Sequence, residues 1–251
     1  EIASCLVGSE MCIRDRPDAD RIPKNQTCPA PHSGGRALFL CLSALSLRLG
    51  LRPIKYRHHL YKTPGGIGKM SHALVFIADG FEEIEALTSV DLLRRGGVDV
   101  KTVSVGGGNL RKGAHGVQIL CDTLLSSADW DQADMLVLPG GWPGAENLGQ
   151  DTVLTGKLKE FAVDPKKWVA AICAAPYVLG GLGLLRGKRA TCYPGFEKYL
   201  EGADVTGGRV ERDGHIITGR GPGTASDFAL ELVEVLEGKE KAEDVRDGLA
   251  G

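Results

Sequence analysis

The sequence lacks the features that define several specialised classes of protein. It has no apolar run near the roughly 20 residues that a membrane-spanning helix needs, so we predict no association with a membrane. Its seven cysteines include no CxxC pair and no Cys/His spacing typical of zinc, so we expect neither a metal site nor a disulfide scaffold. With a net charge of −2 and a pI near 6.4, the chain offers no platform for nucleic acid. A hydrophobic content of 43% indicates a globular protein.

The charge is distributed unevenly along the chain and divides it near Met70. Residues 1–69 hold 11 Lys and Arg against 5 Asp and Glu, whereas residues 70–251 hold 19 against 27. The first segment has no sustained helical or strand period, and its one apolar stretch, 37–47, lies too far from residue 1 for an ordinary secretory signal. We predict that residues 1–69 are disordered and arise from non-native upstream translation, which leaves a cytoplasmic domain. A genuine transit segment, and therefore an organelle, is the alternative.

Residues 70–251 have the pattern of one domain in which strands and helices alternate. Continuous apolar runs at 73–79, 135–138 and 168–173 are typical of strands that are buried on both faces. Further strands are expected at 98–105, 117–121 and 190–193 with a hairpin over 206–218, and helices at 82–95, 176–185, 195–200, 224–236 and 239–249. The alternation predicts an α/β fold with a mainly parallel sheet and helices on both faces. Ligands of such sheets bind beyond the carboxyl ends of the strands.

One cysteine stands at the end of a predicted strand. Cys173 joins the apolar run 168–173 to a predicted helix, and small alanines on either side suit a sharp strand-to-helix turn that lifts one side chain clear of the sheet. Pro176 lacks an amide hydrogen and suits the first turn of the helix. Because free amides at a helix N-terminus favour an anion, we expect a Cys173 thiolate with a lowered pKa.

A second strand ends in Leu138-Pro139-Gly140-Gly141. Glycine allows the backbone to approach the crevice closely and to present its amides there. The N–H groups of Gly141 and Ala174 are therefore candidates to stabilise a developing oxyanion.

Four segments together resemble the ThiJ/PfpI superfamily, most closely its Parkinson-linked protein deglycase branch. They are Phe81-Glu-Glu-Ile-Glu85, the segment 138–141, Ala170-Ala-Ile-Cys-Ala-Ala-Pro176 and Gly219-Arg-Gly-Pro-Gly-Thr224, and the likeness extends over residues 72–247. The resemblance implies a flavodoxin-like three-layer sandwich, a homodimer, and a reactive cysteine at Cys173. It also implies that Glu85 is the paired glutamate, protonated beside the sulfur and able to move protons. No cofactor is implied.

Two departures from the family pattern bear on the chemistry. The position after the cysteine, where family proteases carry histidine, holds Ala174, which disfavours a peptidase or amidase. Tyr193 precedes Pro194 where the deglycase branch often has a histidine, and tyrosine is a poor base at neutral pH. Acid–base work is therefore left to Glu85.

Three functions follow from these residues. The first is a cofactor-independent enzyme of the glyoxalase or deglycase type, in which Cys173 adds to small reactive aldehydes or glycated adducts and Glu85 moves the proton. The second is an oxidative-stress sensor or chaperone that uses the same cysteine. The third, a cysteine peptidase or amidase, lacks the adjacent histidine.

Overall fold

The computed structural model describes residues 70–250, so the predictions for residues 1–69 lie outside the described residues. Within the described part, no helix is long and apolar enough to span a bilayer.

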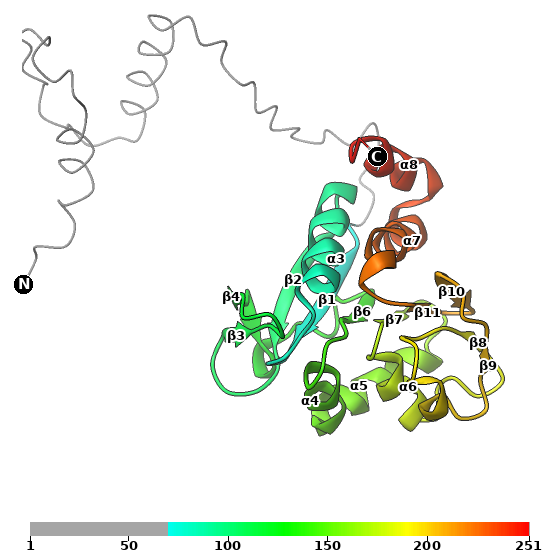
Figure 1. Cartoon of the computed structure of the whole chain (residues 1–251). Helices are drawn as coiled ribbons and strands as arrows, with labels where there is room; N and C mark the ends of the chain where they lie inside the picture. Colours follow the sequence, from blue (N-terminus) through cyan, green and yellow to red (C-terminus); the bar gives the residue numbers. More distant parts are fainter. Residues whose placement is uncertain (1–69, 251) are drawn as a thin grey trace, which may run out of the picture. The chain divides into compact units, whose positions relative to one another are not determined.

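A seven-stranded sheet forms the centre of the domain (Figure 1). In spatial order its strands are β10 (Val210–Asp213), β11 (Ile216–Gly219), β7 (Trp168–Ile172), β6 (Met135–Leu138), β1 (His72–Ile77), β2 (Asp99–Ser104) and β5 (Thr123–Leu124). Only β10 runs antiparallel to its neighbour. The parallel order β2-β1-β6-β7-β11 is that of flavodoxin-like folds. The predicted three-layer α/β class is therefore confirmed.

Two further pairs of short strands flank the sheet. They are β3 (Leu110–Lys112) with β4 (Gln118–Leu120), which is antiparallel, and β8 (Arg189–Ala190) with β9 (Asp204–Val205), which is parallel.

Helices cover both faces of the sheet (Figure 1). On one side lie α3 (Glu83–Gly96), α7 (Ala225–Glu237) and α8 (Lys239–Asp247), which pack against one another. On the other side lie α4 (Gly144–Gln150), α5 (Thr152–Val163) and α6 (Pro176–Gly181). The middle strands are buried almost throughout because both faces are covered, and the largest wholly enclosed side chains include Phe76, Phe81 and Phe228.

Several predicted boundaries were wrong. Helix α6 ends at Gly181 instead of residue 185, and the strand expected at 190–193 is limited to Arg189–Ala190. The hairpin forms, but its first strand begins at Val210 instead of residue 206. Helix α4 and strands β3 and β5 were not predicted, because they are too short to show a period.

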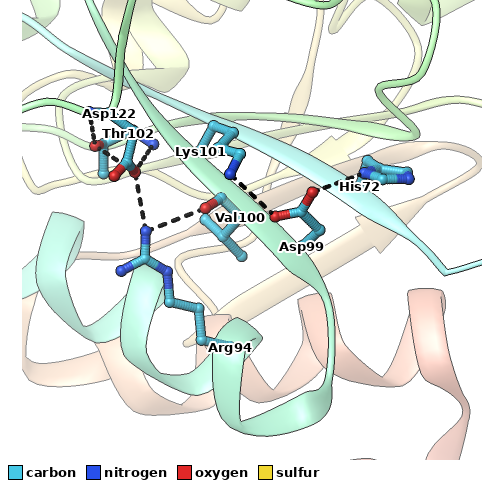
Figure 2. A network of polar contacts seen from close by, with 7 residues as sticks. All are labelled: His72, Arg94, Asp99, Val100, Lys101, Thr102 and Asp122. Atoms are coloured by element: carbon cyan, nitrogen blue, oxygen red, sulfur yellow. Dashed lines mark hydrogen bonds and ion pairs between the residues drawn. The ribbon is translucent and has the colours of Figure 1, made fainter. Parts of the chain in front are cut away.

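A polar network fixes the β5 edge of the sheet to its neighbours (Figure 2). One carboxylate oxygen of Asp122, which precedes β5, accepts hydrogen bonds from the Thr102 backbone N–H at 2.8 Å and hydroxyl at 2.9 Å, and from Arg94 at 2.9 Å. The Asp122 N–H in turn donates to the Thr102 hydroxyl at 2.9 Å. In a second group, Asp99 lies 3.2 Å from His72 and 3.5 Å from Lys101. Burial acts to raise the pKa of Asp122, but the bonds from Thr102 and the charge of Arg94 outweigh it and hold the pKa below its ordinary value.

We expect Asp122→Asn to lower the free energy of unfolding at pH 7 by about 1–2 kcal/mol, because the partners of the carboxylate lose a charged acceptor. A lowered pKa gives stability that is present above the unfolded-state pKa of about 3.9 and lost as the pH falls through the folded-state pKa. The difference in the free energy of unfolding between wild type and Asp122→Asn should therefore become smaller as the pH falls. Urea denaturation between pH 7 and pH 3 measures it. Asp129→Asn, which alters an exposed carboxylate bonded to Gln132, is the control. Equal effects of the two substitutions would contradict the prediction.

Candidate active site

Cys173 lies immediately after β7, at the joint with α6. Its φ of 66° is in the left-handed region, which costs a residue other than glycine on the order of 1–3 kcal/mol. The backbone is held on both sides: the Cys173 N–H donates to the Gly219 carbonyl at 2.9 Å, and its carbonyl accepts from the Tyr193 N–H at 2.8 Å. Neighbouring strands and loops thus impose the turn, and the residue keeps 8% of its surface exposed.

Glu85 reaches the same place from the first turn of α3 and is completely buried. Its Oε2 accepts a hydrogen bond from the Gly140 N–H at 2.8 Å. Among residues 70–250, Oε1 has no hydrogen-bond partner. The carboxyl and Cys173 both border the same point, because a Cβ at Gly140 would stand between them, and the interaction with the Cys173 thiol acts to lower the pKa of Glu85. Oε1 is therefore the oxygen available to carry a proton.

The two glycines after β6 make this approach possible. A Cβ at Gly140 would lie 2.6 Å from the Cys173 Cβ and 2.7 Å from Glu85 Oε2, so no side chain fits there. Gly141 has a φ of 89°, which L side chains rarely adopt. The N–H groups of Gly141 and Ala174 both hydrogen-bond to the Cys173 sulfur. The two amides selected from the sequence thus act on the Cys173 sulfur, the atom next to which an oxyanion would develop.

The pKa of the Cys173 thiol differs from the value predicted from the sequence, whereas the pKa of Glu85 is raised as predicted. Burial raises the pKa of Glu85 to about 7, against the opposing hydrogen bonds from Cys173 and Gly140. The pKa of the Cys173 thiol is also raised, first by burial, then by the charge of Glu85 and the hydrogen bond with it, and the amides of Gly141 and Ala174 only partly oppose this. The expected lowering of the thiol pKa was wrong, because desolvation and the charge of Glu85 outweigh the amides of Gly141 and Ala174.

It follows that the two acids share one site for negative charge. Ionising either group disfavours ionisation of the other, so the pair holds two protons below about pH 7 and one proton above it. Such a pair can release or accept a proton at a pH near neutrality.

The other candidate residues lie around this pair. Tyr193 is 46% exposed, and its ring is 3.1 Å from the point where a Cβ of Gly221 would stand, which is itself 4.0 Å from the sulfur. None of the three histidines among residues 70–250 adjoins Cys173. His72 pairs with Asp99, His115 lies beside Glu83, and His215 contacts Trp168 at the amino end of β7.

Sequence reasoning missed a cluster of Glu82, Glu83 and His115, whose potential ligand atoms lie within 4.8 Å of one another. His115 Nδ1 is 2.9 Å from Glu83 Oε2, and Glu83 Oε1 accepts from the backbone N–H groups of His115 and Val117. The hydrogen bond with Glu83 raises the pKa of His115. For Glu83, burial acts to raise the pKa, but the bonds from His115 and the amides outweigh it. These carboxylate contacts describe an ion pair that ties the 113–117 loop to α3.

A separate open hollow of about 410 Å³ lies beside this end of the sheet and is lined by Asp79, Arg111, Asn147 and Asp151 among others. It includes neither Cys173 nor Glu85. The Arg111 guanidinium is already bonded to Asp79, Ser104 and the carbonyls of Gly107 and Gly108. The arginine therefore holds this loop together, and the reactive geometry is confined to the Cys173–Glu85 pair.

The fold and the sequence together define the class of protein. Residues 71–235 match the DJ-1/PfpI family, and the chain belongs to it.

Individual relatives agree with this assignment. The chain is 44% identical over 173 residues to Protein DJ-1 homolog B of Arabidopsis thaliana, covering 68% of this chain but only 40% of the plant protein. It is 37% identical over 168 residues to the glutathione-independent glyoxalase DJR-1.2 of Caenorhabditis elegans, covering 64% of this chain and 85% of that one. Among solved structures, oxidized Toxoplasma gondii DJ-1 is 38% identical with a TM-score of 0.69, and the match covers 72% of this chain and 98% of that one.

The raised pKa of Glu85 has a consequence for stability. A pKa that is higher in the folded than in the unfolded state gives stability that is complete below the unfolded-state pKa of about 4.3 and is lost as the pH rises through about 7. We therefore expect Glu85→Gln, which cannot ionise, to raise the free energy of unfolding at pH 8 by roughly 2–4 kcal/mol and to have little effect near pH 4. Urea denaturation across this range is the measurement.

Glu83→Gln is the matched control in the same helical turn. The pKa of Glu83 is lowered, so this substitution should decrease the stability at pH 8. If both variants were less stable than wild type at pH 8, the ionised Glu85 carboxylate would not destabilise the fold, and the prediction would be wrong.

Proposed function

We propose that the chain is a cofactor-independent enzyme of the glyoxalase or deglycase type, which converts a 2-oxoaldehyde, or its adduct, into a 2-hydroxy acid at Cys173. The observation that carries the proposal is the enclosure of the Glu85 carboxyl beside Cys173: Glu85 is completely buried, and a Cβ at Gly140 would stand 2.7 Å from its Oε2 and 2.6 Å from the Cys173 Cβ. The name of the nematode relative, a glutathione-independent glyoxalase, supports the same chemistry.

In the first step the sulfur adds to the aldehyde carbon. The S–C bond forms, the C=O π electrons move to oxygen, and the thiol proton passes to the Glu85 carboxylate. We assign the N–H groups of Gly141 and Ala174 to the oxyanion, because both amides act on the sulfur to which the substrate would be bonded. Glu85 then returns the proton to that oxygen, which gives a neutral hemithioacetal. A base with a pKa of about 7 suits both directions of transfer at neutral pH.

In the second step the hydrogen atom is redistributed within the substrate. Glu85 removes the proton from C1, the electron pair forms the C1=C2 bond, and the C2 carbonyl oxygen becomes an oxyanion. That oxyanion takes the proton of the C1 hydroxyl. Glu85 then returns its proton to C2 while the C1 oxygen forms a C=O bond, which leaves a thioester of the 2-hydroxy acid. Water then cleaves the C–S bond, releasing the acid and the thiol. C1 is oxidised while C2 is reduced, so no external oxidant or reductant is needed. With a glycated adduct, the same carbon is attacked and the amine leaves.

The activity should depend on both members of the pair. We expect wild type to form lactate from methylglyoxal without glutathione, with kcat/KM rising through about pH 7 as the pair loses its first proton. Glu85→Gln and Cys173→Ser should each lower kcat/KM at least a hundredfold, because one removes the proton carrier and the other the nucleophile. Enzymatic assay of lactate is the measurement.

Cys121→Ser is the matched control, because it changes another buried thiol, one that lies beside Ser104 and Arg111. Undiminished turnover in Cys173→Ser would refute the proposed site. If wild type has no carbonyl activity, but mild peroxide selectively converts Cys173 to a sulfinate in mass spectra, the oxidative-stress sensor becomes the better reading.

We also propose a homodimer, as the family resemblance implies. On the outer side of α3, Ile84 is 55% exposed and Leu87 is 41% exposed, and Val117 and Leu120 add exposed apolar surface near the loop that pairs with Glu83. A second copy of the chain is the occupant that we assign to this face.

A charge on that face should separate the two copies. We expect Leu87→Glu to shift the mass measured by light scattering from dimer toward monomer, because burying an unpaired carboxylate opposes association. Val163→Glu, which changes an 80% exposed residue at the end of α5 on the other side of the sheet, is the control and should remain dimeric. A wild type that is monomeric at every concentration would contradict the homodimer.

A further inference from the structure

A group of aromatic side chains surrounds Trp142, directly beyond the glycine pair of the site. The Trp142 ring lies 5.8 Å from Tyr177, edge to face, and 5.6 Å from Phe196, and Tyr199 contacts both of these at 5.1 and 5.8 Å. We call Trp142, Tyr177, Phe196 and Tyr199 the aromatic rim. Trp142 nevertheless remains 47% exposed. A large ring that is held by its neighbours but still half open to solvent has contact area to offer a ligand.

The aromatic rim is tied to the reacting sulfur through backbone bonds. Trp142 follows Gly141, whose N–H meets the sulfur. Tyr177 is in the first turn of α6, and its N–H donates to the carbonyl of Ala174 at 3.0 Å. Phe196 donates to the Tyr193 carbonyl at 3.1 Å, and the Tyr193 N–H donates to the carbonyl of Cys173. Three separate segments that carry these rings are thus joined to the backbone around Cys173 by hydrogen bonds or by adjacency in the sequence.

Tyr193 adds a further ring next to the sulfur. Its side chain packs over Gly221, where a Cβ would stand 3.1 Å from the Tyr193 ring and 4.0 Å from the sulfur, and Tyr193 is nearly as exposed as Trp142. A substrate whose aldehyde carbon is bonded to Cys173 would place its substituent among these rings. A methyl group would leave most of this aromatic surface in water, whereas a planar ring would cover it.

We propose that the aromatic rim is a subsite for a planar aromatic substituent, so that the preferred substrates are aryl 2-oxoaldehydes, such as phenylglyoxal, and the products aryl 2-hydroxy acids, such as mandelate. This inference rests on the proposed function for the reaction, but the binding of the aryl group does not require turnover. The bonds made and broken are those given above, with an aryl group in place of the methyl.

Two measurements test the subsite, one of them independent of catalysis. In Cys173→Ser, calorimetry should show that mandelate binds roughly two- to tenfold more tightly than lactate, which is the range expected for one or two aromatic contacts. In the active enzyme, the ratio of kcat/KM for phenylglyoxal to that for methylglyoxal should fall by a similar factor in Trp142→Leu. Trp142→Phe, which keeps a ring, should largely restore the ratio.

Trp130→Leu is the matched control. It makes the same substitution at a tryptophan that stacks on Phe76 at 5.6 Å, before the amino end of β6, and it should leave the ratio unchanged. The ratio of the two kcat/KM values does not change if part of the protein is unfolded, because both values fall equally. If Trp142→Leu does not fold, Phe196→Leu provides a second test.

The outcomes separate this inference from the proposed function. Mandelate binding that depends on Trp142 in a protein without carbonyl turnover would support the subsite and refute the proposed reaction. Equal binding of mandelate and lactate, or an unchanged ratio in Trp142→Leu, would overturn the subsite while leaving the reaction intact. A fall in mass by light scattering in Trp142→Leu would overturn it too, because the rim would then be covered by a second copy of the chain.

Discussion

The site depends on the burial of one carboxyl group beside the Cys173 side chain, in a space that leaves no room for a side chain at residue 140. Glu85 is completely enclosed, and its Oε2 accepts a hydrogen bond from the Gly140 N–H. Any residue larger than glycine there would collide with both Glu85 and Cys173. The sheet, the helix and the turn must therefore all be in place before the carboxyl can reach the sulfur. Burial of an acid that ionises only near pH 7 is the cost that the fold bears for this contact.

The same burial determines how the sulfur can react. A thiolate stabilised only by helix amides would be permanently charged, whereas the thiol here is desolvated and faces an acid that competes for the same charge. The left-handed backbone at Cys173 is held by hydrogen bonds with Gly219 and Tyr193. In the proposed reaction, proton transfer within the pair takes the place of a permanent thiolate, and the aromatic rim contacts the substituent of the substrate.

The parts of the fold that could be predicted are those with strong local signals. The uninterrupted apolar strand at 135–138 has the bounds that the sequence indicated, because burial on both faces leaves no polar position in it. The short helix α4 and strand β5 could not be predicted in this way, because seven and two residues are too few for a period, and their formation depends on tertiary partners such as Asp122 and Thr102. Helix α6 was predicted too long, since nothing local distinguishes its end at Gly181 from the apolar residues that follow.

For the site, the sequence by itself determined which residue types stand at the carboxyl ends of the strands: a cysteine between alanines, a pair of glycines, and an acid at the start of a helix. Only the tertiary structure decided which of the three acids at that helix start is enclosed with the sulfur, because Glu82, Glu83 and Glu85 have the same local chemistry and differ in the direction in which the folded helix points them. It also decided the sign of the thiol pKa shift and the gathering of rings around Trp142. Desolvation and contacts between distant segments arise only when the chain is packed, so no local pattern records them.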